Sequence, residues 1–341
     1  MTSYDTKSVA GVLSEREGLQ RVVLSDGSRA YNLTQLTGLI GIGDHVVVNT
    51  TAVELGLGTG GWHVVHWNLS NSSLRTDGGG HIMKLRYTSL QTDTGSFEEA
   101  GAVFTRHESL RGLPVIVCSL HSQMAAAAVA FRSAAPNARL VYVMTDGASL
   151  PLALSDLAAD LCDRGIVNAT VTCGHAFGGD SEAVNIPSAL IAAAYVHAAD
   201  VVIVSMGPGA VGTGTTLGTT ALEVVDITTW VHRLGGRAIL ALRGSEADER
   251  PRHRGVSHHS STALGFLRAS ATPVMLALPD GDTSLLSMAE NRKVVDVSAT
   301  MSLFDLPPAI TSMGRNVRAD PLFFRLSAAA GLVAAHMLQQ L

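Results

Sequence analysis

The sequence predicts an α/β protein: a Rossmann-like, mostly parallel sheet with helices on both faces, preceded by a small N-terminal β-barrel-like domain. Three observations predict this class. The first third of the chain shows short apolar alternations without a helical pattern. From Leu113 onward, continuous apolar runs alternate with helical stretches. Apolar residues make up 46% of the chain and charged residues only 16%, which suits a sheet buried on both faces.

Residues 1–90 are expected to form a small antiparallel β-barrel-like domain. Asp26-Gly27 predicts a hairpin, because a type I′ turn needs positive φ at its central residues. The expected strands are SVAGVLS (8–14), LQRVVLS (19–25), SRAYNL (28–33), HVVVNT (45–50), HVVHWNL (63–69) and HIMKLRY (81–87).

Residues 91–112 are polar and mixed, as in a connecting segment, and residues 113–341 are expected to form the α/β domain. Its predicted strands are 114–120, 139–146, 169–174, 200–206, 237–243 and 273–279. Its predicted helices are 122–134, 151–164, 186–198, 219–234, 260–269 and an apolar C-terminal helix over 322–341. Ligands of such sheets bind outside the carboxyl ends of the strands, so the site is expected there.

The composition bears on partners and setting. A net charge of −5 argues against a nucleic-acid footprint, and no apolar run reads as a membrane span or a signal peptide. The cysteines Cys118, Cys162 and Cys173 have no paired spacing, which is typical of reduced thiols in a cytoplasmic protein. The low charge and the small residues of the C-terminal helix favour a homodimer.

A glycine-rich segment follows the predicted strand 200–206 and precedes a helix. Gly207, Gly209 and Gly212 match GxGxxG, and Thr213, Gly214 and Thr215 continue it. Glycines there let backbone N–H groups approach an anion, which makes this a candidate phosphate-binding loop. The alternatives are a crowded turn without a ligand, or NAD(P) binding, for which the acidic ribose partner is not evident.

A second segment, Arg250–His259, carries three arginines and three histidines without an acid. We expect Arg252 and Arg254 to clamp phosphate or carboxylate oxygens, and His258 and His259 to exchange protons. The alternative is a solvated basic loop.

Other strand ends add candidates. His121 and His175 follow predicted strands and are candidate acid/base groups, although Ser122 beside His121 has an adequate role as a helix cap. Lys84 is a candidate anion ligand; a solvent-facing strand side explains it equally well. His175, His258 and His259 with Asp146 or Asp180 could form a metal site if the loops converge, but we assign no metal ligands from the sequence and no cofactor.

The segments NTTAVELGLGTGG, GHIMKLRYTSLQ, SLHSQ, SMGPGAVGTGTTLG and RHRGVSHHS resemble a bacterial family known as domain of unknown function 3866. The resemblance covers essentially the whole chain. Because that family has no assigned activity, the resemblance implies a full-length bacterial, cytosolic member and no catalytic residue.

The leading hypothesis from the residues is an enzyme of group transfer or hydrolysis that binds a small anionic ligand, phosphorylated or nucleotide-like, at the carboxyl edge of the sheet. A non-catalytic ligand-sensing or assembly protein is the first alternative, and an NAD(P)-dependent oxidoreductase is the second.

Overall fold

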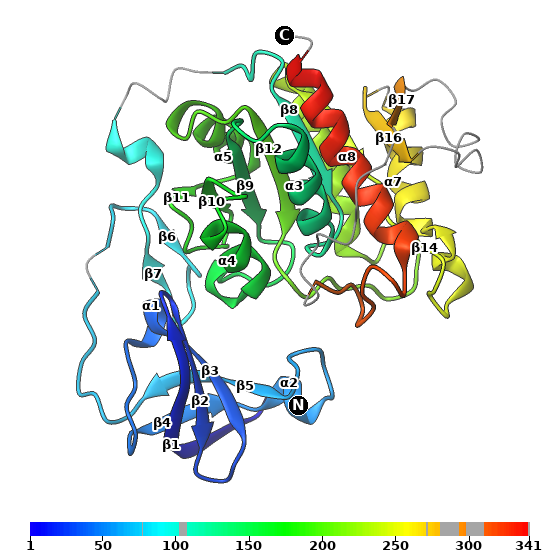
Figure 1. The fold of residues 1–341 in the computed structure, drawn as a ribbon. Coiled ribbons are helices and arrows are strands. Elements are labelled where there is room, and N and C mark those ends of the chain that lie inside the picture. Colours follow the sequence, from blue (N-terminus) through cyan, green and yellow to red (C-terminus); the bar gives the residue numbers. More distant parts are fainter. Residues whose placement is uncertain (77, 102–107, 271, 280–292, 298–309, 340–341) are drawn as a thin grey trace. The chain divides into compact units, whose positions relative to one another are not determined.

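The chain divides into two compact units, Met1–Gly95 and Ser96–Leu341, which are described separately. The structure is a computed structural model that describes residues 1–76, 78–101, 108–270, 272–279, 293–297 and 310–339. The predicted connecting segment, the loop before the C-terminal helix and the last residues of that helix lie partly outside the described residues (Figure 1).

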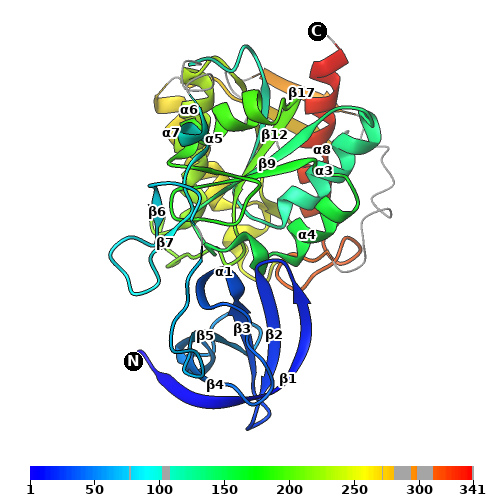
Figure 2. The same ribbon diagram turned by 90° about the vertical axis from the view of Figure 1, so that its left-hand side faces the viewer.

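The first unit is a closed barrel of five strands in the order β1-β2-β3-β5-β4 (Figure 2). The strands are β1 (Tyr4–Arg16), β2 (Leu19–Leu24), β3 (Arg29–Leu33), β4 (His45–Asn49) and β5 (Trp62–Asn68), with the short helices α1 (Thr34–Thr37) and α2 (Thr51–Glu54) between them. Alternate residues such as Val22, Val46 and Val48 fill its interior. The expected barrel is therefore confirmed, although β3 and β5 pair in parallel and not antiparallel.

Two details of the first unit differ from the prediction. The expected strand 81–87 shrinks to β6 (Met83–Lys84), which pairs with β7 (Thr92–Asp93) and not with the barrel. Positive φ angles of 52° at Leu85 and 62° at Tyr87 explain this, because such residues cannot continue a strand. The hairpin at Gly27 is present, but only Gly27 has positive φ (83°), as in a type I turn with a bulge.

The second unit is built on an eight-stranded sheet in the order β11-β10-β9-β12-β8-β13-β16-β17, and every neighbouring pair is parallel. Its strands are β8 (Pro114–Cys118), β9 (Leu140–Thr145), β10 (Ala169–Cys173), β11 (Ser181–Ala183), β12 (Val201–Met206), β13 (Arg237–Ala241), β16 (Met275–Pro279) and β17 (Lys293–Val297). All six predicted strands are present. The sequence pattern missed the two edge strands, because β11 is a three-residue polar segment and β17 carries the charged residues Lys293 and Asp296 among only three apolar ones.

Helices cover both faces of this sheet, as predicted. One face packs against α3 (Gln123–Ala134), α4 (Asp156–Asp163) and α8 (Pro321–Gln339), and the other against α5 (Ile186–Ile191), α6 (Glu223–Arg233) and α7 (His258–Ala269). Short helical turns η1 (Phe97–Ala100), η2 (Leu152–Leu154), η3 (Ala192–Val196), η4 (Thr220–Leu222) and η5 (Pro251–His253) and the ribbon β14 (Gly244–Ser245) with β15 (Gly255–Val256) complete the unit. Successive residues of a strand enter opposite cores: Ile116 lies in one and Val117 in the other.

The C-terminal helix α8 lies against α3 on the sheet (Figure 1). The two helices approach so closely that a Cβ atom on Gly331 would lie 2.1 Å from the Ala127 carbonyl oxygen. Length and apolar composition would let α8 cross a membrane, but 78% of its apolar window is buried inside the protein. We therefore interpret α8 as a core helix. Its small residues serve contacts within the chain, so they no longer argue for a subunit interface.

Candidate functional site

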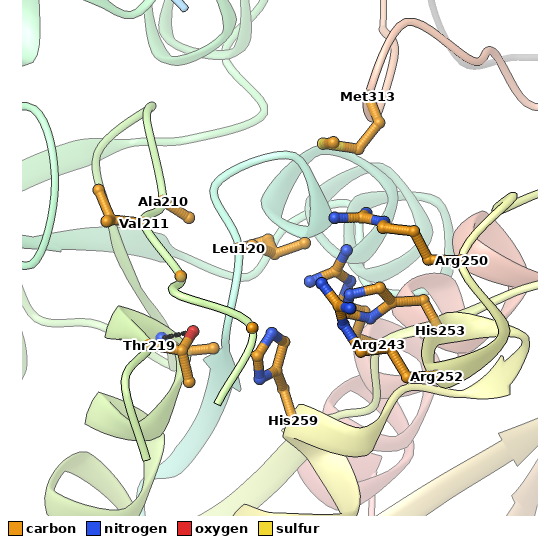
Figure 3. Close-up of a pocket in the computed structure, with 13 residues that line it drawn as sticks. Leu120, Ala210, Val211, Thr219, Arg243, Arg250, Arg252, His253, His259 and Met313 are labelled. Atoms are coloured by element: carbon orange, nitrogen blue, oxygen red, sulfur yellow. Dashed lines mark hydrogen bonds between the residues drawn. The ribbon is translucent and has the colours of Figure 1, made fainter. Parts of the chain in front are cut away.

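A pocket lies at the carboxyl edge of the sheet, beyond the ends of β8, β12 and β13. The connection from β8 crosses β12 to reach β9, and the connection from β12 crosses β8 to reach β13. Two neighbouring strands thus send their chains in opposite directions, which opens a crevice where ligands of α/β sheets bind. The pocket has a volume of about 200 Å³, and Leu120 after β8, Ala210 after β12 and Arg243 after β13 contribute to its wall (Figure 3).

Three arginines enter this pocket from one side: Arg243, Arg250 and Arg252 (Figure 3). Asp248 neutralises Arg250 through a bidentate pair, with Nε–Oδ1 and Nη2–Oδ2 distances of 2.9 Å each. Within the described part of the chain, Arg243 and Arg252 form no ion pair, and no carboxylate lines the pocket. The pocket wall therefore carries uncompensated positive charge.

The unpaired charge of Arg243 is the costly one, because this residue is only 9% exposed and water can solvate its guanidinium very little. Burial, and then the positive charge of Arg250, lower the pKa of its guanidinium to about 10. The group is still protonated at neutral pH, so the fold holds a charge in an environment that disfavours it. An anion in the pocket would relieve that cost.

The basic segment is held beside β13 by backbone contacts. The Ser257 N–H donates to the Arg243 carbonyl at 2.8 Å, and the Arg243 N–H donates to Ser260 Oγ at 2.9 Å. These bonds fix the first turn of α7 next to the end of the strand. Three imidazoles meet there: His253 from η5, and His258 and His259 from α7.

The three imidazoles are neutral groups in this setting. Burial, followed by the charge of Arg243, lowers the pKa of His253 to about 4. Burial and then His258 lower the pKa of His259 to about 4, and burial and then Arg252 lower the pKa of His258. His253 and His259 line the pocket directly, so their neutral nitrogens face the same space as the arginines (Figure 3).

The glycine loop forms the opposite wall, through Ala210, Val211, Gly212 and Gly214. It is not a dinucleotide fingerprint, because the chain bridges Gly212 with Thr219 before the helical turn begins at Thr220. Gly207 and Gly209 lie outside the lining, and a Cβ on Gly207 would meet the Ser149 carbonyl at 2.4 Å.

Thr213 and Thr215 form hydrogen bonds within the glycine-rich loop 207–218. Thr213 Oγ1 and Thr215 Oγ1 lie 2.9 Å apart, and the Gly218 N–H donates to Thr215 Oγ1 at 3.0 Å. Their hydroxyl groups shape the loop, while Gly212 and Gly214 present backbone to the pocket.

The other predicted residues lie elsewhere. His121 is half-buried and has a partner at both ring nitrogens: its Nδ1 lies 3.2 Å from the Met206 carbonyl and its Nε2 lies 2.6 Å from Ser155 Oγ. The His175 backbone N–H donates to Asp146 Oδ2, and neither residue lines the pocket. Arg254 also lies outside the lining and donates through Nε to the Asp248 carbonyl. Lys84 belongs to the first unit and is 1% exposed, so the alternative of a solvent-facing strand side is wrong, whereas its role as an anion ligand stays a prediction.

Among the arginines and histidines that line the pocket, three were not predicted as ligands: Arg243, Arg250 and His253. A signal existed for each of them. Arg243 ends the predicted strand 237–243, and the other two belong to the basic segment.

The model of the family described only as "Protein of unknown function (DUF3866)" matches residues 29–331. The chain belongs to this family. The match spans both units and includes every residue of the pocket. No curated protein and no solved structure matches the chain. Membership in DUF3866 therefore brings no activity, and the site's chemistry must come from its own residues.

Proposed function

We propose that this DUF3866 protein is an enzyme of group transfer or hydrolysis that binds a small phosphorylated ligand in the pocket beyond β8, β12 and β13. One observation carries the proposal: Arg243 and Arg252 present unpaired guanidinium groups to a pocket whose described lining has no carboxylate. Guanidinium forks match phosphate oxygens in charge and geometry. The imidazoles of His253 and His259 lie beside them and, being neutral, offer ring nitrogens to a ligand or a metal ion.

The size of the pocket limits which ligands can fit. A volume of about 200 Å³ is below the range of drug-sized sites, so it suits a phosphoryl group with a small remainder. A dinucleotide would need a longer groove and a helix that starts at the glycine loop. The NAD(P)-dependent alternative therefore has less support than the phosphate ester.

The test is isothermal titration with inorganic phosphate and with glycerol phosphate. We expect saturable binding that weakens with salt, and a loss of about tenfold or more in affinity for Arg243→Met and for Arg252→Met, because each charge-assisted bond contributes about 1.5–3 kcal/mol. Arg254→Met is the matched control, since it removes the same charge from the same segment outside the pocket. The proposal fails if wild-type protein binds neither probe, or if Arg243→Met binds as wild type does.

Binding and turnover are separable. Hydrolysis of a chromogenic phosphate monoester would support the enzyme, whereas binding without turnover of any ester would favour the ligand-sensing alternative.

The setting is part of the proposal. Three free cysteines, two of them buried in strands, support a reducing cytoplasm, and a bacterial source rests on the family resemblance alone. A homodimer remains a proposal that rests on the low charge content alone, and light scattering on the purified protein tests it.

A further inference from the structure

His253, His258 and His259 form a compact trio of imidazoles. Each offers one ring nitrogen, and these three atoms lie within 4.8 Å of one another. The ring centroids of His258 and His259 are 4.0 Å apart, and His253 lies 5.0 and 5.2 Å from them. No other residue of this kind completes the trio among the described residues, so any ligand set here is all-nitrogen.

The trio contains nitrogens without partners. His258 Nε2 and His259 Nδ1 are buried and have no hydrogen-bond partner in the described part of the protein. A buried polar atom in this state is costly, and most such atoms in folded proteins are satisfied by a protein group, a water or an ion. Adjacent neutral imidazoles cannot satisfy all of one another's lone pairs, because each carries a single proton.

A hydrogen bond with Ser257 orients the imidazole ring of His253. Its Nδ1 lies 2.8 Å from Ser257 Oγ, which leaves Nε2 as the free nitrogen of that ring. Ser257 is itself fully buried and caps α7 by accepting a hydrogen bond from the His259 backbone N–H at 3.3 Å. A partner that fixes the second nitrogen is what histidine ligands of metals usually have.

We propose that His253, His258 and His259 bind one divalent transition-metal ion, of zinc or cobalt type, with a coordination position left open toward the arginine pocket. Imidazole sets without carboxylates suit these ions and not magnesium or calcium. Zinc bound at its usual length holds ligand nitrogens about 3.4 Å apart, so small side-chain rotations close the observed trio around an ion. Because His253 and His259 also line the pocket, the open position faces the space that Arg243 enters.

An ion there would place a Lewis acid beside the proposed anion. The arginines repel a second positive charge, whereas a bound anion compensates both. Metal and phosphate should therefore strengthen each other's binding by the same factor. This coupling rests on the proposed function, but the metal site itself does not.

The first experiment uses the full chain, stripped with a chelator and titrated with Zn²⁺ and Co²⁺ in phosphate-free buffer. We expect one equivalent of metal per chain, and visible absorption typical of four-coordinate Co²⁺. His253→Ala and His259→Ala should each lower the zinc affinity by about 100-fold. His232→Ala, which removes an exposed histidine from α6, is the control and should bind as wild type does. Wild-type protein that binds no equivalent of either ion overturns the proposal, whether or not the variants fold.

The second experiment removes a neighbouring charge. Without phosphate, Arg243→Met should raise the zinc affinity several-fold, because it removes repulsion beside the site. The exposed Arg268→Met on the same helix as His258 is the control and should change nothing. An unchanged affinity in Arg243→Met places the bound ion elsewhere and overturns the assignment. Phosphate titration of the stripped protein separately tests the anion site, so the two proposals fail independently.

Discussion

At the carboxyl edge of the sheet, polar residues at or after the ends of β8, β9 and β10 bond to other groups of the protein, and we call this the closed side. On the open side, polar residues beyond β12 and β13 face the pocket. On the closed side, His121 is bonded at both ring nitrogens and Thr145 donates to Glu223 at 2.8 Å. On the open side, Arg243 and Arg252 have no ion pair with any described residue. Both sides contain titratable residues that directly follow strands.

This difference separates the polar residues that stabilise the fold from those that can bind a ligand. A buried polar group without a partner costs about 1–3 kcal/mol, so a stable protein retains one such as Arg243 only where something else supplies the partner. A histidine that is bonded at both ring nitrogens, such as His121, stabilises the fold, whereas an arginine without an ion pair, such as Arg243, is available to a ligand. Substitutions on the two sides should therefore affect different measurements.

The largest effect is expected at Asp248, which anchors the open side. This carboxylate is 2% exposed, forms the bidentate pair with Arg250 and lies 3.5 Å from an Arg315 Nη2 atom. Asp248→Ala removes three hydrogen bonds that Arg250 donates and leaves Arg315 with Asp320 alone, so it should lower the free energy of unfolding by about 4 kcal/mol. Urea denaturation measures it. The neighbouring exposed Glu249→Ala should cost almost nothing, and an equal loss in both variants would contradict the ion-pair account.

The next effect concerns pH on the closed side. Burial, opposed by the Thr145 hydrogen bond and reinforced by Asp146, raises the pKa of Glu223 from 4.5 to about 7. The unfolded chain loses this proton at lower pH than the folded one. The group's contribution to stability therefore declines as pH rises from about 4.5 to about 7, by about 3 kcal/mol, and is constant above that.

Glu223→Gln should remove this decline while its amide oxygen still accepts from Thr145. The variant should be more stable than wild type above neutral pH and similar to it in acid. Denaturation series across this range measure it, with the exposed Glu249→Gln as the control. A wild-type slope that persists in Glu223→Gln would assign the titration to another group.

Much of the fold was accessible from periodicity. Strands such as Val201–Met206 are continuous apolar runs because both of their faces are buried, and short apolar runs that alternate with helical stretches are typical of a parallel sheet. Ser181–Ala183 could not be found in this way, since a three-residue polar edge strand owes its conformation to its neighbour β10. The failed strand at 81–87 has a backbone cause, because positive φ at Leu85 and Tyr87 leaves no mark in hydropathy.

The sequence could predict where the site lies, but not which residues form it. A parallel sheet brings its strand ends to one edge, so the basic segment and the glycine loop could be expected to meet there. Whether a side chain bonds within the protein or faces the pocket depends on residues that are distant in the sequence. Ser155, which bonds His121, lies 34 residues away, and nothing in the local sequence around His121 indicates it.

The smallest effect, at His121, separates the two sides most sharply. His121→Asn cannot reach both the Met206 carbonyl and Ser155 Oγ, so it should lower the free energy of unfolding by about 2 kcal/mol while leaving phosphate affinity unchanged. Arg243→Met should do the reverse: it removes a buried, unpaired charge, so stability holds or rises while phosphate affinity falls. Calorimetric titration and urea denaturation of both variants, with the exposed His336→Asn as the control, test the contrast. If His121→Asn loses phosphate and Arg243→Met keeps it, the working side of the edge is the one that we describe as closed.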